Sequence, residues 1–200
     1  MHTATAGVTG CVLAGGLGRR FGGVDKGLVT LASRPLVAHV VARFAPQVEH
    51  LLISANRHHA HYRAHATTVL GDRDAEAAGP LAGIAVALAA STTPLLAVVP
   101  CDAPFLPLDL VARLRAALAR ERGEIAVART ADGLQPTFAL LRVELAPTLD
   151  AYLAGGERKA EGWLRRHALV EVDFDARFGE FHNVNTPEEL AAATRRLAGP

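Results

Sequence analysis

The sequence is poor in the residues that staple small secreted folds or attract polyanions. Its 200 residues include only two cysteines, Cys11 and Cys101, far apart in the chain and outside any CxxC pattern. This excludes a disulfide scaffold and a structural zinc ligand set, and it suits a reducing compartment. The formal net charge of +1 is too small to favour nucleic acid or an anionic membrane as a partner. We therefore expect a cytoplasmic protein in which any basic site is local.

The sequence also lacks a secretory or membrane-spanning pattern. The opening residues 1–10 contain no basic region followed by a long apolar run, so we expect no secretory signal. Residues 77–101 carry no charge, but Ser91–Pro94 divides them into a helix-prone half and a short apolar run of strand type. A helix leading into a buried parallel strand accounts for this composition, and we expect no membrane partner.

Apolar segments of strand length alternate with helical patterns along the chain. This alternation predicts βαβ units and a mostly parallel sheet covered by helices, in a single α/β domain that 200 residues can bury well. The predicted strands span residues 8–14, 48–54, 67–70, 95–99, 124–128, 137–141 and 169–174. The predicted helices span residues 35–45, 81–90, 107–120 and 143–154, and a last one follows an N-capping signature at Thr186 and ends near Leu197.

A glycine-rich loop follows the first predicted strand. Clustered glycines leave backbone N–H groups free to face a polyphosphate, with no Cβ to block close approach. Arg19, Arg20 and Lys26 add cations to the same loop. A tight surface turn with incidental charge is the alternative, but a strand, several glycines and three cations together favour a phosphate cradle.

Two common nucleotide-binding loops are excluded here. A Walker A loop needs Gly-Lys-Ser/Thr, whereas Lys26 lies between Asp25 and Gly27. A Rossmann fingerprint would place glycine at position 21, where the chain has Phe21. Only two of the 21 basic residues are lysines, which favours a special use of Lys26 as a compact point charge.

An aspartate follows the strand predicted at residues 95–99. Ligands of open parallel sheets bind at the carboxyl ends of the strands, where Gly15 and Asp102 would both lie if their strands are neighbours. One or two carboxylates, with phosphate oxygens and water, typically hold Mg²⁺. Asp102 is therefore a candidate magnesium ligand, and a turn-forming residue between prolines is the alternative. Asn185 is a further candidate ligand, although asparagine is also common just before a capped helix.

Two other groups receive a simpler interpretation. The histidines His58, His59, His61 and His65 lie in a polar segment without a matching acidic pair, and we interpret them as a solvated face rather than a transition-metal site. Cys101 has no activating histidine nearby in the sequence, so we interpret it as a buried thiol.

Together these motifs resemble the molybdenum-cofactor guanylyltransferases, MobA-type enzymes of the glycosyltransferase-A-like nucleotidyltransferase fold. The resemblance covers essentially the whole chain and rests on residues 13–28, 35–36, 53–57, 79–83, 100–102, 135–138 and 183–190. It implies a Rossmann-like three-layer domain, with a nucleotide-binding part at about residues 8–105 and an acceptor-binding part at about residues 106–200. It also implies Mg²⁺-dependent transfer of GMP from GTP to the phosphate of molybdenum-molybdopterin, with release of pyrophosphate. The implied partners are GTP, a molybdopterin-type acceptor and, as further candidates, insertion chaperones of molybdoenzymes.

The resemblance also implies roles for individual residues. Asp102 would bind GTP and Mg²⁺, and Lys26 the phosphates. The remaining nucleotide contacts would come from Leu13, Ala14, Gly15, Ser54 and Asp72. Apart from the resemblance, the cations and backbone N–H groups of the loop add Arg19 as a candidate for charge stabilisation in catalysis and Gly16 as a candidate nucleotide contact.

Three alternatives remain open at this point. Cytidylyl transfer to molybdopterin and nucleotidyl transfer to a sugar phosphate would keep both the glycine-rich loop and Asp102, but the motifs at residues 79–83, 100–102 and 183–187 together count against them. A non-catalytic GTP-binding adaptor would need the glycine-rich loop but would not need Asp102.

The role of Asp72 is also open. Its carboxylate could accept hydrogen bonds from guanine, hold the ribose, or cap a turn.

Overall fold

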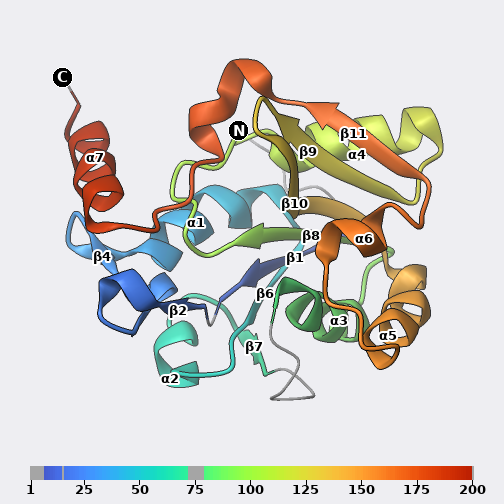
Figure 1. Cartoon of the computed structure of the whole chain (residues 1–200), viewed down its shortest axis with the longest axis horizontal. Helices are drawn as coiled ribbons and strands as arrows, with labels where there is room; N and C mark the ends of the chain where they lie inside the picture. The colour runs from blue at the N-terminus through green and yellow to red at the C-terminus, as the bar shows by residue number, and fades with distance from the viewer. Residues whose placement is uncertain (1–6, 15, 72–78, 200) are drawn as a thin grey trace.

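A seven-stranded sheet forms the centre of the computed structural model, which describes residues 7–14, 16–71 and 79–199 (Figure 1). The strands lie in the order β11-β9-β10-β8-β1-β6-β7. They are β1 (Val8–Leu13), β6 (His50–Ser54), β7 (Thr68–Leu70), β8 (Leu95–Pro100), β9 (Ile125–Thr130), β10 (Gly133–Arg142) and β11 (Leu169–Asp173). Neighbouring pairs are parallel except those that involve β10, which is antiparallel to β8 and β9. The predicted α/β fold with a mostly parallel sheet is confirmed.

The antiparallel placement of β10 follows from a short connection. Strand β9 ends at Thr130 and β10 begins at Gly133, whose φ of +102° lies in the region that favours glycine. Two intervening residues suffice for a hairpin but not for the crossover that a parallel pair needs. The strands predicted from the sequence, residues 124–128 and 137–141, stop short of this turn, and the extension of both strands toward it was not predicted.

Helices cover both faces of the sheet in a three-layer arrangement (Figure 1). Helices α1 and α4 share one hydrophobic core with the first face, and α3, α5 and α6 share a second core with the other. Alternation along β1 sends Val8 and Val12 to the first core and Cys11 to the second. The helices are α1 (Leu36–Phe44), α2 (His59–Tyr62), α3 (Pro80–Ala90), α4 (Leu110–Glu121), α5 (Ala146–Ala154), α6 (Ala160–Leu164) and α7 (Pro187–Ala198).

Helix α3 explains the uncharged stretch of the sequence. All of its residues from Leu81 to Leu88 are buried between the sheet and neighbouring elements such as α5, so no polar face is needed. Strand β8, which follows it, is buried on both faces. Within the described part of the chain, no helix is both long and apolar enough to cross a membrane.

Some predicted boundaries were wrong. The helix expected from Pro107 begins at Leu110, because Gln47 binds both groups that a helical hydrogen bond would join: its Nε2 donates to the Pro107 carbonyl at 2.8 Å and its Oε1 accepts from the Val111 N–H at 3.0 Å. The helix expected at 143–154 is divided into the 3-10 turn η4 (Val143–Leu145) and α5. The short helices α2 and α6 were not predicted, since a single turn leaves too little periodicity to detect.

Several small elements shape the segment between β1 and α1. They are β2 (Leu17–Gly18), η1 (Arg19–Phe21), β3 (Val24–Asp25), η2 (Lys26–Leu28), β4 (Thr30–Leu31) and β5 (Arg34–Pro35); η3 (Ala45–Gln47) and η5 (Asp175–Glu180) lie elsewhere in the chain. Strands β2 and β3 pair antiparallel, so the glycine-rich loop folds back on itself as a hairpin. A third hydrophobic cluster, which includes Leu31, Leu36, Phe105, Val184 and Ala193, packs this segment against α7.

Candidate functional site

The carboxyl ends of three parallel strands meet at the centre of the sheet. Leu13, the last residue of β1, is in register with Ser54 of β6 and with Pro100 of β8. The Ala14 N–H donates to the Ser54 carbonyl at 2.7 Å, and the Cys101 N–H donates to the Leu13 carbonyl at 3.0 Å. The glycine-rich loop therefore begins beside the residues that follow β8, as the sequence analysis expected for neighbouring strands.

At this edge, Lys26 bridges two side chains that lie far from it in the sequence. Its Nζ lies 3.3 Å from Asp102 Oδ2 and donates to Asn185 Oδ1 at 2.5 Å. The Lys26 side chain is 25% exposed and that of Asp102 only 8%, so the ammonium group marks the boundary between the interior and solvent. The Lys26 N–H donates to the Gly16 carbonyl at 3.2 Å, which joins the two ends of the hairpin.

The segment that carries Asn185 is held from both sides. On one side, the Val184 N–H donates to the backbone carbonyl of Asp102 at 2.8 Å. On the other, Glu189 Oε2 accepts from the N–H groups of Asn185 at 2.6 Å and Thr186 at 3.0 Å. Thr186 and Glu189 form the capping box predicted for α7, so the start of that helix also fixes the asparagine.

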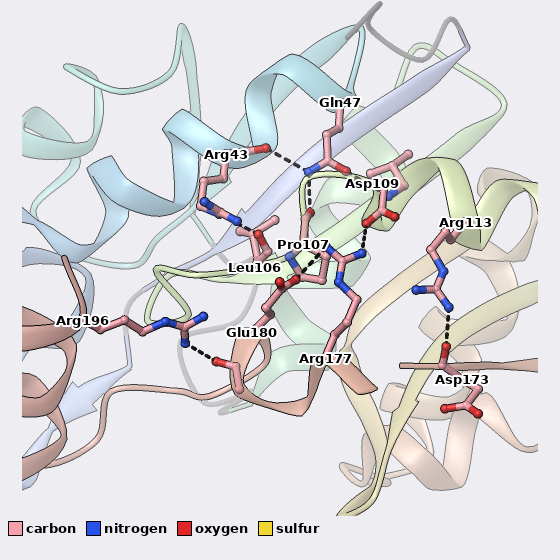
Figure 2. Close-up of polar contacts among 12 residues, drawn as sticks. Arg43, Gln47, Leu106, Pro107, Asp109, Arg113, Asp173, Arg177, Glu180 and Arg196 are labelled. Atoms are coloured by element: carbon pink, nitrogen blue, oxygen red, sulfur yellow. Dashed lines mark hydrogen bonds and ion pairs between the residues drawn. The ribbon is translucent and has the colours of Figure 1, made fainter. Parts of the chain in front are cut away.

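A polar network fixes the loop that follows Asp102 (Figure 2). From α1, Arg43 Nε donates to the Leu106 carbonyl at 2.7 Å. From the opposite side, Arg177 of η5 pairs with Asp109 and with Glu180, the latter at 3.0 Å. Because η5 leads into the segment that carries Asn185, the same network fixes both chain segments whose side-chain oxygens accept hydrogen bonds from Lys26.

Burial controls the ionisation of the two residues after β8. Burial raises the pKa of the Asp102 carboxyl above its ordinary value, and the Lys26 ammonium opposes this shift. Burial, reinforced by the neighbouring Asp102 carboxylate, also raises the pKa of the Cys101 thiol far above its ordinary value. Cys101 therefore stays protonated and is not a nucleophile, whereas the Lys26 ammonium favours the charged form of Asp102 that burial disfavours.

The structure places the other predicted residues unevenly. Leu13 and Ala14 lie at the end of β1, next to the site, and Gly16 is exposed in the hairpin. Ser54 is only 2% exposed, and a Cβ added to Gly83 would lie 2.8 Å from its Oγ, so its hydroxyl lies beneath the first turns of α3. Gly15, Asp72 and the side chain of Arg19 lie outside the described part of the chain, and their roles stay predictions.

The oxygen ligands at the site suit a hard divalent cation. The Asp102 carboxylate and the Asn185 amide oxygen already share one cation, the Lys26 ammonium. Two residues earlier, Asn183 Oδ1 is buried and has no hydrogen-bond partner among the described residues. The described residues contain no group of three or more His, Cys, Asp or Glu side chains that could hold a metal. One carboxylate with neutral oxygens fits Mg²⁺, which typically completes its shell with phosphates and water.

Comparison with known proteins assigns the chain to a family. The MobA-like NTP transferase domain matches residues 10–172. The chain belongs to this family. It is 48% identical to the molybdenum cofactor guanylyltransferase of Burkholderia orbicola (strain MC0-3), over 96% of this chain and 98% of that protein.

Solved structures agree with the fold. The crystal structure of molybdopterin-guanine dinucleotide biosynthesis protein A from Archaeoglobus fulgidus superposes with a TM-score of 0.80 at 23% identity, covering 96% of this chain and 100% of that one. A protein from Mycobacterium tuberculosis H37Rv, solved in complex with manganese, superposes with a TM-score of 0.64 at 19% identity, covering 94% of this chain and 98% of that one. The expected nucleotidyltransferase fold is thus confirmed.

The sequence analysis missed one group of residues beside the site. Asp25, next to Lys26, is 3% exposed and contacts Tyr62 and His58. Only one signal pointed to it: an acidic residue in a loop otherwise suited to phosphates, where a carboxylate has no direct use. His58 was assigned to a solvated face; its side chain is 48% exposed, and its Nδ1 also lies 3.3 Å from Asp25 Oδ2.

Proposed function

We propose that the chain transfers GMP from GTP to the phosphate of molybdenum-molybdopterin and releases pyrophosphate. The observation that carries this proposal is the convergence of Lys26, Asp102 and Asn185 at the carboxyl ends of β1 and β8. The 48% identity to a molybdenum cofactor guanylyltransferase over nearly the whole chain supports the choice of nucleotide and acceptor. The nucleotide binds mainly to residues 8–105 and the acceptor mainly to residues 106–200.

The chemistry requires charge stabilisation more than a protein nucleophile. The acceptor phosphate is already an anion, and the difficulty is to bring two anions together while charge develops on pyrophosphate. Lys26 would contact the nucleotide phosphates, and the N–H groups of the glycine-rich loop would offer further donors. This chemistry requires neither a protein nucleophile nor an acid–base pair, and the protonated state of Cys101 agrees with that.

Mg²⁺ is the cofactor we propose for this site. Asp102 would hold it, with Asn185 as a second oxygen ligand, and the ion would supply neutralisation of phosphate charge and orientation of the leaving group. A divalent cation would also favour the charged form of Asp102, which burial disfavours. The manganese complex of the mycobacterial protein supports a divalent cation as a cofactor of this fold.

Asp72 is the residue we propose for selection of guanine. A carboxylate can accept hydrogen bonds from N1–H and N2–H₂ of guanine, whereas adenine offers an acceptor at N1 and no 2-amino group. An unpaired buried polar group costs about 1–3 kcal/mol, which corresponds to discrimination of about tenfold or more. Asp72→Asn should therefore lower the ratio of the turnover rate with GTP to that with ATP. An unchanged ratio with both rates depressed would assign Asp72 to the ribose instead.

The experiment that tests the function is a panel of the four NTPs with a molybdopterin acceptor and Mg²⁺, in which pyrophosphate release is followed. We expect turnover with GTP that depends on the acceptor. Preference for CTP would favour the cytidylyl alternative, and turnover only with a sugar phosphate would favour that class of acceptor. GTP binding without turnover under any of these conditions would favour an adaptor.

A further inference from the structure

Asp25 presents a carboxylate that the proposed chemistry does not use. Its side chain is 1% exposed. The next residue, Lys26, is by contrast partly exposed to solvent and pairs with Asp102, the candidate metal ligand. Enclosing a carboxylate in this way is unfavourable unless several donors satisfy it. Asp25 has three: Tyr62 Oη donates to Oδ1 at 2.5 Å, the Gly27 N–H donates to Oδ1 at 3.2 Å, and His58 Nδ1 lies 3.3 Å from Oδ2.

Two of these donors come from a distant part of the chain. The Gly27 contact is local and would by itself make Asp25 the cap of the three-residue turn η2. Tyr62 and His58, however, belong to the segment after β6, and Tyr62 is fully buried. His58 has a φ of +55°, in the left-handed region that residues other than glycine seldom adopt, so the chain accepts an unfavourable backbone conformation beside this contact.

The packing around Gly27 shows how closely the tyrosine fits. A Cβ at Gly27 would lie 2.6 Å from Tyr62 Oη and 3.2 Å from Cys101 Sγ, so only glycine lets the loop approach this side chain. Burial and the neighbouring Asp25 raise the pKa of the Tyr62 phenol above its ordinary value, which keeps it protonated as a hydrogen-bond donor. Lys26 thus lies between Asp25 and Gly27, two residues whose positions Tyr62 fixes.

We propose that Asp25 is a positioning residue for Lys26, held by Tyr62 and His58 so that the lysine ammonium is directed at Asp102, Asn185 and the nucleotide phosphates. This inference rests on the proposed function of Lys26. In this proposal Tyr62 and Asp25 touch no reacting atom, and they act only through Lys26. A purely structural role would instead lower stability and leave the folded protein's handling of GTP intact.

A double-mutant cycle separates these two roles. Tyr62→Phe removes only the phenol oxygen, and Lys26→Ala removes the group that it is proposed to position. In the full-length protein with GTP, Mg²⁺ and molybdopterin, we expect Tyr62→Phe to lower kcat/KM for GTP about tenfold, since a hydrogen bond to a charged group corresponds to about that factor or more. In the Lys26→Ala background the same change should alter kcat/KM less than about twofold, because coupled residues are non-additive. The KM for the acceptor should not move in either background.

A matched control removes another buried hydroxyl from the same sheet. Thr9 lies near the opposite end of β1 and its Oγ1 lies 2.8 Å from Thr93 Oγ1, so Thr9→Val tests the loss of a buried hydrogen bond away from the site. We expect Thr9→Val to change Tm without changing kcat/KM for GTP. Asp25→Asn, measured on the folded protein, should lower kcat/KM for GTP as Tyr62→Phe does.

The outcomes are distinguishable. Equal losses from Tyr62→Phe in both backgrounds, or a fall in Tm with kcat/KM unchanged, would overturn the positioning role and leave the proposed function standing. Failure of the wild-type protein to bind GTP or to release pyrophosphate would overturn the proposed function itself, and the positioning role with it.

Discussion

Replacement of Asp102 by asparagine separates what the site needs for catalysis from what the fold needs for stability. Asp102→Asn keeps the shape of the side chain and leaves intact the backbone carbonyl that accepts from the Val184 N–H at 2.8 Å. It removes the charge that faces Lys26 at 3.3 Å and that we propose to hold Mg²⁺. Loss of a single group that stabilises developing charge typically lowers kcat by about 10²–10³-fold, and we expect at least this loss here.

The stability of the same variant should not fall along with its activity. Because burial raises the pKa of Asp102, the fold favours its neutral form, and this stabilisation is present below the ordinary pKa of 3.8 and is lost as pH rises through the higher folded pKa. Asp102→Asn is neutral at every pH, so its free energy of unfolding relative to wild type should increase across that window. The hydrogen bond from Lys26 becomes weaker when its acceptor is a neutral amide oxygen, and this opposes the gain by about 1 kcal/mol.

Thermal melting without Mg²⁺, from pH 3.5 to 8, together with pyrophosphate release at neutral pH, measures both effects. We expect the Tm of Asp102→Asn at pH 7 to fall by no more than about 2–4 °C, the shift that about 1 kcal/mol produces in a chain of this size, or to rise. A large fall in Tm at pH 7 would show that the charged carboxylate stabilises the fold, and would refute the reasoning from burial. Near-normal turnover in the folded variant would refute the metal assignment.

Three further predictions address the elements around the site. Lys26→Ala should lower kcat/KM for GTP by about 10²-fold or more while the order of preference among NTPs stays the same; a changed preference with an unchanged rate would place the lysine in the base pocket. Gly83→Ala would bring a Cβ within 2.8 Å of Ser54 Oγ. Overpacking of this kind costs about 1–3 kcal/mol, measurable by urea unfolding. Gly71→Ala is its control, because the nearest atom to the added Cβ there is 3.6 Å away. Glu189→Ala removes half of the capping box of α7 and should destabilise the protein by about 1 kcal/mol. It should also raise the Mg²⁺ concentration needed for half-maximal activity, and unchanged Mg²⁺ dependence would show that the cap does not position the metal ligands.

Local patterns in the sequence predicted the parts of the fold that local physics determines. The strand at 95–99 was recognisable because it is buried on both faces, and the start of α7 because Thr186 and Glu189 satisfy each other's backbone groups within four residues. The rules for parallel sheets place the ligand-binding edge at the carboxyl ends of the strands, so they predicted Asp102 beside the glycine-rich loop on the condition that the two strands are neighbours. The pairing of β1 with β8 in the structure meets that condition.

The contacts that complete the site depend on packing between distant segments, which periodicity does not encode. Asn185 reaches Lys26 because the cluster containing Leu31 and Val184 packs α7 against the loop, and residue types alone do not specify that approach. The same holds for Asp25. Its partner Tyr62 lies in a four-residue helix within a histidine-rich segment, too short for a helical pattern and too polar to be expected at a core position. A carboxylate beside a lysine that we propose to bind phosphate has a clear use only once its buried donors are known, because without them it would merely neutralise the lysine. The hydrogen bond from Tyr62 and the contact with His58 direct that charge inward and leave the Lys26 ammonium for Asp102 and Asn185.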